Sequence, residues 1–102
     1  MSDGTPDVSS IQHDRSAGRF TTTVDGLQGY VAYTEDGGVM TITHTVVPDA
    51  IGGRGIAGRL VQAALEHARG AGLEVLPQCS YAAAYMDKHP EYADLRANAA
   101  GP

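Results

Sequence analysis

The chain of 102 residues has one cysteine, no tryptophan and one phenylalanine, and its seven basic residues are outnumbered by twelve acidic ones. A single cysteine, Cys79, excludes a disulfide scaffold and a cysteine-based zinc site, and we expect a reducing cytoplasm as the compartment. The net charge of −5 argues against nucleic-acid binding and a polybasic membrane anchor, because both need a cationic surface. No apolar run approaches the roughly 20 residues of a transmembrane helix, and the polar first residues do not resemble a signal peptide.

What remains is the composition of one small globular domain, with 42% hydrophobic and 19% charged residues. Residues 1–10 are rich in Gly, Pro, Ser and Asp and predict a disordered start, and residues 96–102 predict a flexible tail. The domain is therefore expected over residues 11–95. Its acidic residues gather in the first half of the chain, which indicates either a solvated surface or an approach that attracts a cationic amine.

The first half predicts three antiparallel strands in succession, over Arg19–Val24, Gln28–Thr34 and Val39–Val47, separated by Asp-Gly and Asp-Gly-Gly turns. Strict alternation in the third strand places His44 on one face with Met40, Ile42 and Val46. On that otherwise apolar face, His44 is either a satisfied core residue or a functional one.

The second half changes to helical periodicity. Apolar residues at helical spacing predict a helix from Gly55 to about Arg69, followed by a short buried strand over Leu73–Pro77 and a second helix over Tyr81–His89. A strand that follows a crossover helix lies parallel to the strand before it. The expected fold class is α+β, an antiparallel meander followed by β-loop-α-β-α.

A glycine-rich loop lies between the third strand and the first helix, over residues 48–60. Glycines let the backbone approach a ligand closely, and a helix start offers unpaired N–H groups, so the segment predicts a pyrophosphate-binding loop; the alternative is a flexible connection. It is neither a P-loop, because no Gly-Lys-Ser/Thr follows, nor a Rossmann fingerprint, because a meander precedes it.

Gly53-Arg54-Gly55-Ile56-Ala57-Gly58 resembles the acetyl-CoA loop of GNAT-type N-acetyltransferases. Further matches at His44-Thr45, Leu73 to Cys79 and Tyr85 to Tyr92 make residues 11–95 similar to the small YjdJ-type branch of that superfamily. The resemblance implies a minimal GNAT-like domain in which the central strand pair splays apart. It also implies acetyl-CoA, or coenzyme A, as co-substrate and a small amine or a protein amine as acceptor.

The resemblance further implies where the co-substrate binds. The backbone of Val46 and Val47 would pair with the pantetheine arm. The pyrophosphate would be held by the loop and the helix start, comprising Gly53, Arg54, Gly55, Ile56, Ala57, Gly58 and Arg59.

Three residues are expected to carry the chemistry. Cys79, by itself most simply a small buried hydrophobe, becomes an active-site thiol under the resemblance, either as an acetyl-cysteine intermediate or as a neighbour that assists direct transfer. His44 would be the general base, and Tyr85 either protonates the leaving thiolate or packs on the helix. His13 and an exposed His67 are too scattered for a metal site, and no metal is expected.

The function expected from these residues is acetyl transfer from acetyl-CoA to an amine. One alternative is a coenzyme A-binding module of the same fold with little or no transferase activity. The other is a protein-interaction module with no affinity for coenzyme A.

Overall fold

The fold is described from a computed structural model over residues 11–53 and 55–97. Its elements in chain order are β1 (Gln12–Asp14), β2 (Arg19–Val24), β3 (Leu27–Asp36), β4 (Val39–Val46), η2 (Asp49–Ile51), α1 (Ile56–Ala71), β5 (Glu74–Pro77), α2 (Ser80–Lys88) and η3 (Pro90–Leu95). The five strands form one sheet in the order β1-β2-β3-β4-β5. The first four are antiparallel and β5 runs parallel to β4, which confirms the predicted α+β topology.

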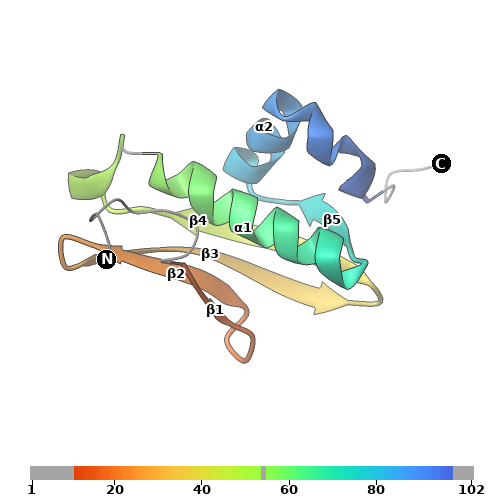
Figure 1. The fold of residues 1–102 in the computed structure, drawn as a ribbon, viewed down its shortest axis with the longest axis horizontal. Coiled ribbons are helices and arrows are strands. Elements are labelled where there is room, and N and C mark those ends of the chain that lie inside the picture. The colour runs from red at the N-terminus through yellow and green to blue at the C-terminus, as the bar shows by residue number, and fades with distance from the viewer. Residues whose placement is uncertain (1–10, 54, 98–102) are drawn as a thin grey trace, which may run out of the picture.

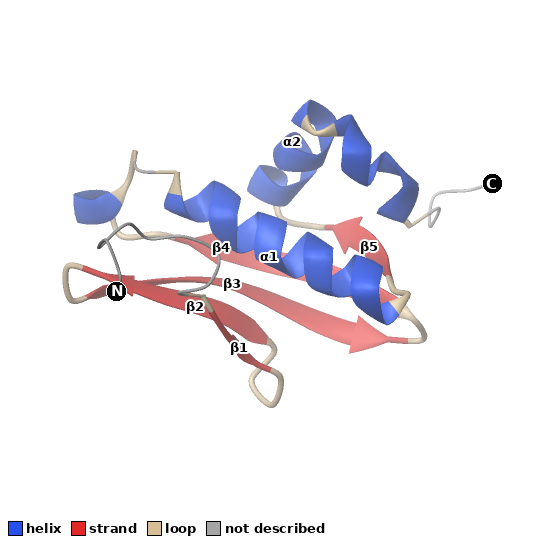
Figure 2. Cartoon of the chain, in the orientation of Figure 1, coloured by secondary structure: helices blue, strands red, loops and turns tan. Residues whose placement is uncertain are grey.

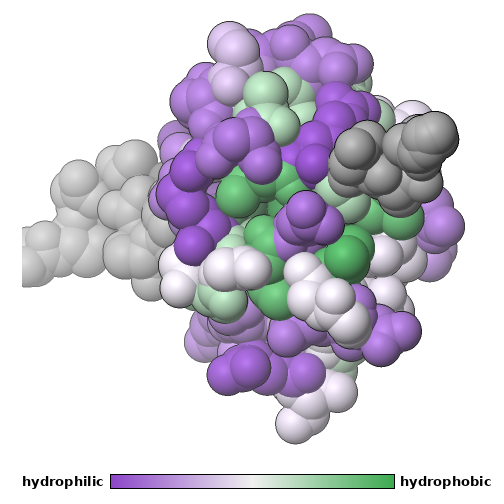
Figure 3. Space-filling model, turned by 90° about the vertical axis from the view of Figure 1, so that its right-hand side faces the viewer, coloured by the Kyte–Doolittle hydropathy of each residue, from purple (hydrophilic) through white to green (hydrophobic). Residues whose placement is uncertain are grey.

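The helices cover one face of the sheet, with α1 lying along the strands and α2 beside it (Figures 1 and 2). Alternate residues of β2 and β3 are buried under α1, among them Phe20, Val31 and Tyr33. Seen from the end where α1 terminates, hydrophobic residues gather in the middle of the molecule with hydrophilic ones around them (Figure 3). The core therefore lies between two layers, and no described helix covers the other face of the sheet.

The apolar stripe of α1 explains its place on the sheet. Its buried residues recur at helical spacing and end in Leu65 and Ala68. Gly72 adopts a left-handed conformation (φ 74°) and its N–H bonds to Ala68 and Arg69, which closes the helix as the glycines there predict. At the other end of α1 the N-cap is Gly55, which has no side chain that could accept hydrogen bonds from the first N–H groups of the helix.

A β-bulge in β4 changes which way its side chains point. Ala32 pairs with His44 and the next residue, Tyr33, pairs with Ile42, so Thr43 is the extra residue. Its Oγ1 donates to the carbonyl of Ala32 at 3.2 Å. A bulge reverses the alternation beyond it, so the predicted common face of His44 with Ile42 is wrong.

Past the bulge, β4 and β5 separate. β5 pairs with β4 only from Val39 to Ile42, where the amides of Gln78 and Cys79 both donate to the carbonyl of Ile42. The rest of β4 has no described neighbour on that side in the strand order. This is the splayed strand pair that the resemblance implies.

The first two residues of the predicted tail contact β5. Arg96 bridges to Val75 of β5, and the amide of Ala97 donates to the carbonyl of Val75 at 2.7 Å. The predicted disordered start at residues 1–10 and the rest of the predicted tail lie outside the described residues. Within the described part of the chain, no helix is long and apolar enough to span a membrane.

Candidate functional site: the start of helix α1 and the open edge of strand β4

A cavity of about 290 Å³ opens at the N-terminal end of α1. The predicted loop provides most of its walls, and the residue after β4 and helix α2 supply one residue each. The cavity is lined by Val47, Gly52, Gly53, Gly55, Ile56, Ala57 and Tyr81. Gly29 helps to form this end of the molecule. A Cβ there would lie 3.3 Å from the carbonyl oxygen of Val46 and 3.6 Å from a methyl of Ile56, so glycine allows the chain segments to approach closely.

The loop suits an anionic ligand. Gly53 and Gly55 have φ values of 79° and 75°, which other residues rarely adopt, and both are exposed with no atom near the position of a Cβ. The first N–H groups of α1 have no capping side chain, and its first turn contains no acidic residue. Unpaired amides and the positive end of a helix dipole favour phosphate oxygens. The residues present therefore fit the pyrophosphate of coenzyme A.

The residues predicted to bind coenzyme A differ in how far they are buried. Ile56 anchors the first turn in the core at 3% exposure, while Ala57, Gly58 and Arg59 are half-buried. Val46 is exposed on β4, and Val47 is half-buried and faces the helix layer. Arg54 lies outside the described residues.

Cys79 lies where β5 ends and α2 begins. It is the N-cap of α2, its carbonyl accepts the amide of Ala83, and its thiol is half-buried. Its Sγ is 3.4 Å from Oγ1 of Thr45, on the part of β4 that β5 has left. The thiol therefore sits at the opening between the two central strands.

The environment of the thiol favours its ionised form. Burial raises the pKa of Cys79, but hydrogen bonds from the Thr45 hydroxyl and from the amides of Ala82 and Tyr81 outweigh it and lower the pKa below its ordinary value. A thiol with a lowered pKa at a helix N-terminus is more reactive than a structural cysteine.

His44 is exposed, so of the two alternatives for this residue the core histidine is wrong. It pairs with Ala32, which faces away from the core, and its Nδ1 lies 3.1 Å from Oγ1 of Thr43. Because Thr45 opposes the buried Val31, His44 and Thr45 point to opposite faces of the sheet. The structure brings His44 and Cys79 to the same stretch of β4, from opposite sides.

Tyr85 belongs to α2 and faces the start of α1. Its ring lies near Gly58, where a Cβ would be 3.5 Å away, and it stacks on the ring of His89 at 4.0 Å. Burial and the nearby Glu91 raise the pKa of Tyr85, which keeps the phenol protonated. His89 is the C-cap of α2.

The remaining histidines correct one expectation. His67 is half-buried, not exposed, and its ring meets that of His13 edge-on at 4.5 Å. His13 also stacks on Phe20 at 3.9 Å and shares a hydrogen bond with the Tyr33 hydroxyl. Among the described residues no group of three or more His, Cys, Asp or Glu could hold a metal ion.

Sequence reasoning missed Thr45 and Tyr81. Tyr81 lines the cavity, and its hydroxyl would lie 3.4 Å from a Cβ at Gly58. The spacing of four residues between Tyr81 and Tyr85, just after Cys79, could have shown that both lie on one helix face. The side of β4 on which Thr45 lies depends on the bulge, which the alternation conceals.

Comparison with known proteins gives the family. Residues 19–95 match the family described as GCN5-related N-acetyl-transferase. Protein NATD1 of Gallus gallus and of Homo sapiens is each 34% identical over 83 residues, covering 78% of this chain and 76% and 74% of theirs. The solution structure of a GCN5-like protein from Staphylococcus aureus aligns with a TM-score of 0.69 and 30% identity, over 85% of this chain and 86% of that one. The chain belongs to the GCN5-related N-acetyltransferase (GNAT) family.

Proposed function

We propose that this GNAT-family chain binds acetyl-CoA at the start of α1 and transfers its acetyl group to an amine. The observation that carries the proposal is the uncapped helix start beside the gap between β4 and β5, with the Cys79 thiol at that gap. The single unpaired thiol is best suited to a reducing compartment, so we place the reaction in the cytoplasm.

The chain's own residues would hold the co-substrate at two places. The amides of the first turn of α1 and the exposed glycines before it suit the pyrophosphate, with Arg54 and Arg59 as candidate cationic groups. The backbone at Val46 and Val47, beyond the part of β4 that pairs with β5, suits the amide groups of the pantetheine arm. Bound acetyl-CoA supplies the thioester whose acyl group is transferred.

Three side chains would serve the transfer. His44 is exposed and can take the proton that the attacking amine loses, since imidazole is the side chain that most often serves as a general base. Tyr85 stays protonated and can give a proton to the departing thiolate. Cys79 would lie beside the thioester, with two open roles: taking the acetyl group itself or assisting direct transfer.

The test is calorimetric binding of coenzyme A to two variants of one residue. Ala57 lines the cavity in the first turn of α1, where a glutamate stabilises the helix dipole but repels a pyrophosphate. We expect Ala57→Glu to weaken binding more than about 10-fold while its melting temperature stays equal or rises. The matched control Ala57→Gln has the same size without the charge and should keep most of the affinity.

Three outcomes separate the candidate functions. Acetyl-CoA binding with acetylated amine as product supports the proposal. Binding without transfer to any amine would identify a coenzyme A-binding module. No binding by the wild-type chain would contradict the proposal entirely and leave the protein-interaction module.

A further inference from the structure

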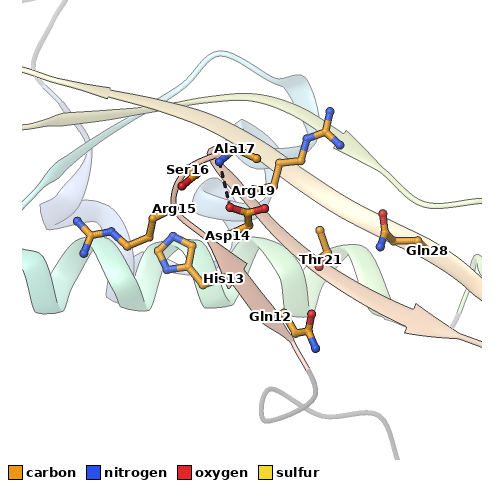
Figure 4. A pocket seen from close by; sticks show the side chains of 9 residues that line it. All are labelled: Gln12, His13, Asp14, Arg15, Ser16, Ala17, Arg19, Thr21 and Gln28. Carbon is orange, nitrogen blue, oxygen red and sulfur yellow. Dashed lines mark hydrogen bonds between the residues drawn. The ribbon is translucent and has the colours of Figure 1, made fainter.

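The helix-free face of the sheet carries a polar cavity of about 610 Å³. Three strands and the β1–β2 turn line it, and the strand residues are Gln12, His13, Asp14, Arg19, Thr21 and Gln28 (Figure 4). Arg15, in the turn, is the second cation of the cavity. Asp14 is partly engaged, because its Oδ1 accepts the amide of Ala17 at 3.1 Å. The cavity thus combines two guanidinium groups and neutral hydrogen-bonding side chains with one carboxylate, that of Asp14, which pairs with Arg19 across the strands.

Register places this cavity on the same face as His44. Arg19 pairs with Ala32, and Ala32 pairs with His44, so the three form one row across β2, β3 and β4. Neighbouring strands lie about 4.8 Å apart, which puts Arg19 and His44 roughly 10 Å apart at Cα. Tyr30 pairs with Val46 in the next row, on the same face.

Arg19 leans toward β4. Its guanidinium carbon lies 4.3 Å from the centre of the Tyr30 ring. Tyr30 lies on β3 and pairs with Val46 of β4, so the cation is held on the side of β2 that faces β4. Among the described residues Arg19 forms no salt bridge, so stacking orients its charge without neutralising it. A guanidinium stacked in this way keeps its N–H edge available for two hydrogen bonds to a carboxylate.

The two faces of the sheet meet at the open edge of β4. The cavity proposed for acetyl-CoA belongs to the helix side, with Val47 and the start of α1. A ligand at His44 lies on the other face, one residue along β4 from Thr45, and Thr45 contacts Cys79. No strand separates the two faces at this point, because β5 pairs with β4 only as far as Ile42. An acceptor amine could thus reach the thioester from the helix-free face.

We propose that the acceptor is an amine that also carries a carboxylate, and that Arg19 binds this carboxylate on the helix-free face while the amine lies at His44. This inference rests on the proposed function. Glu35 and Asp36, which would attract a purely cationic polyamine, end β3 away from Tyr30. Asp14, the carboxylate within the cavity, accepts the amide of Ala17.

The test compares acceptors that differ only in the carboxylate. Acetyl transfer to lysine and to its decarboxylated form, cadaverine, is measured by mass spectrometry of the product. We expect kcat/KM to be about 10- to 100-fold higher for lysine, the range of a charge-assisted hydrogen-bonded pair. Arg19→Ala should abolish the preference through KM, and Arg19→Lys should restore part of it. Arg15→Ala, in the same cavity but outside the row, is the matched control and should keep the preference.

Each result has a defined meaning. Equal transfer to both amines, or an equal loss of both in Arg19→Ala, would overturn the carboxylate site and leave the proposed function standing. If coenzyme A binds but no amine is acetylated, the transferase function fails and the acceptor site is judged by NMR titration. Lysine, but not cadaverine, should then shift the amide signals of Arg19 and Tyr30, and no shift would refute the site.

Discussion

Replacing Thr45 by valine should slow the reaction of the Cys79 thiol with an alkylating reagent. Valine has nearly the same shape as threonine but no hydroxyl, so the change removes the hydrogen bond of 3.4 Å to Sγ and leaves the packing of β4. That hydroxyl is the first of the contacts that lower the pKa of Cys79 against the opposing effect of burial. Without it, a smaller fraction of the thiol is ionised at neutral pH.

The size of the effect follows from the geometry. A hydrogen bond to a charged group contributes roughly 1.5–3 kcal/mol. This one is long and half-buried, so we take a value just below that range, about 1.4 kcal/mol, which corresponds to a tenfold change in an equilibrium constant. The alkylation rate at pH 7 should therefore fall about tenfold, because the thiolate is the reacting species.

The assay is the rate of iodoacetamide labelling between pH 5 and pH 9, followed by intact mass. Cys79 is the only cysteine in the chain, so every labelled molecule reports on it. The matched control is Thr43→Val, because the Thr43 hydroxyl bonds to Ala32 and His44 instead. Equal rates in Thr45→Val and wild type, or a wild-type rate no faster than that of the unfolded chain, would refute the reasoning. Incubation with acetyl-CoA alone then separates the two roles of Cys79, since only the covalent one adds an acetyl group to the protein.

Two further predictions concern stability. Burial and the adjacent His67 lower the pKa of His13 below 6.5, so the folded state takes up a proton less readily than the unfolded state. The free energy of unfolding should be highest above pH 6.5 and fall as the pH decreases below it, and His13→Phe should reduce this fall in urea denaturation. Burial and the hydrogen bond from the Tyr92 hydroxyl to Glu66 (2.6 Å) raise the pKa of Tyr92 to about 12. Stability from this raised pKa, a few kcal/mol at most, is present below pH 10 and is lost toward pH 12. The difference in free energy of unfolding between wild type and Tyr92→Phe should therefore shrink over that range, and a constant difference would contradict the role of this bond.

The sequence predicts the long elements because their periodicities are strong. The strands β2 to β5, helix α1 and helix α2 all begin and end within two residues of the predicted positions. The strand β1 was not predicted, because three residues are too few to show alternation. Because β1 was missing from the prediction, His67 was expected to be exposed. In the structure His13, which lies on β1, packs against His67. The helix η3 was not predicted. A proline marks the end of the preceding helix, α2, but Pro90 is also compatible with the first turn of a new helix.

The decisive feature of the candidate site, the bulge at Thr43, is invisible in the sequence because Val39–Val47 reads as one uninterrupted alternating strand. Regular pairing through this segment would turn His44 into the core and Thr45 outward, away from Cys79. The extra residue exposes His44 and gives Cys79 its hydroxyl partner. Sequence reasoning could therefore propose the residues of the site but not their faces. If the two faces of β4 do serve the acceptor and acetyl-CoA respectively, one inserted residue is what divides them, and it lies where β5 turns away and lets the two ligands meet.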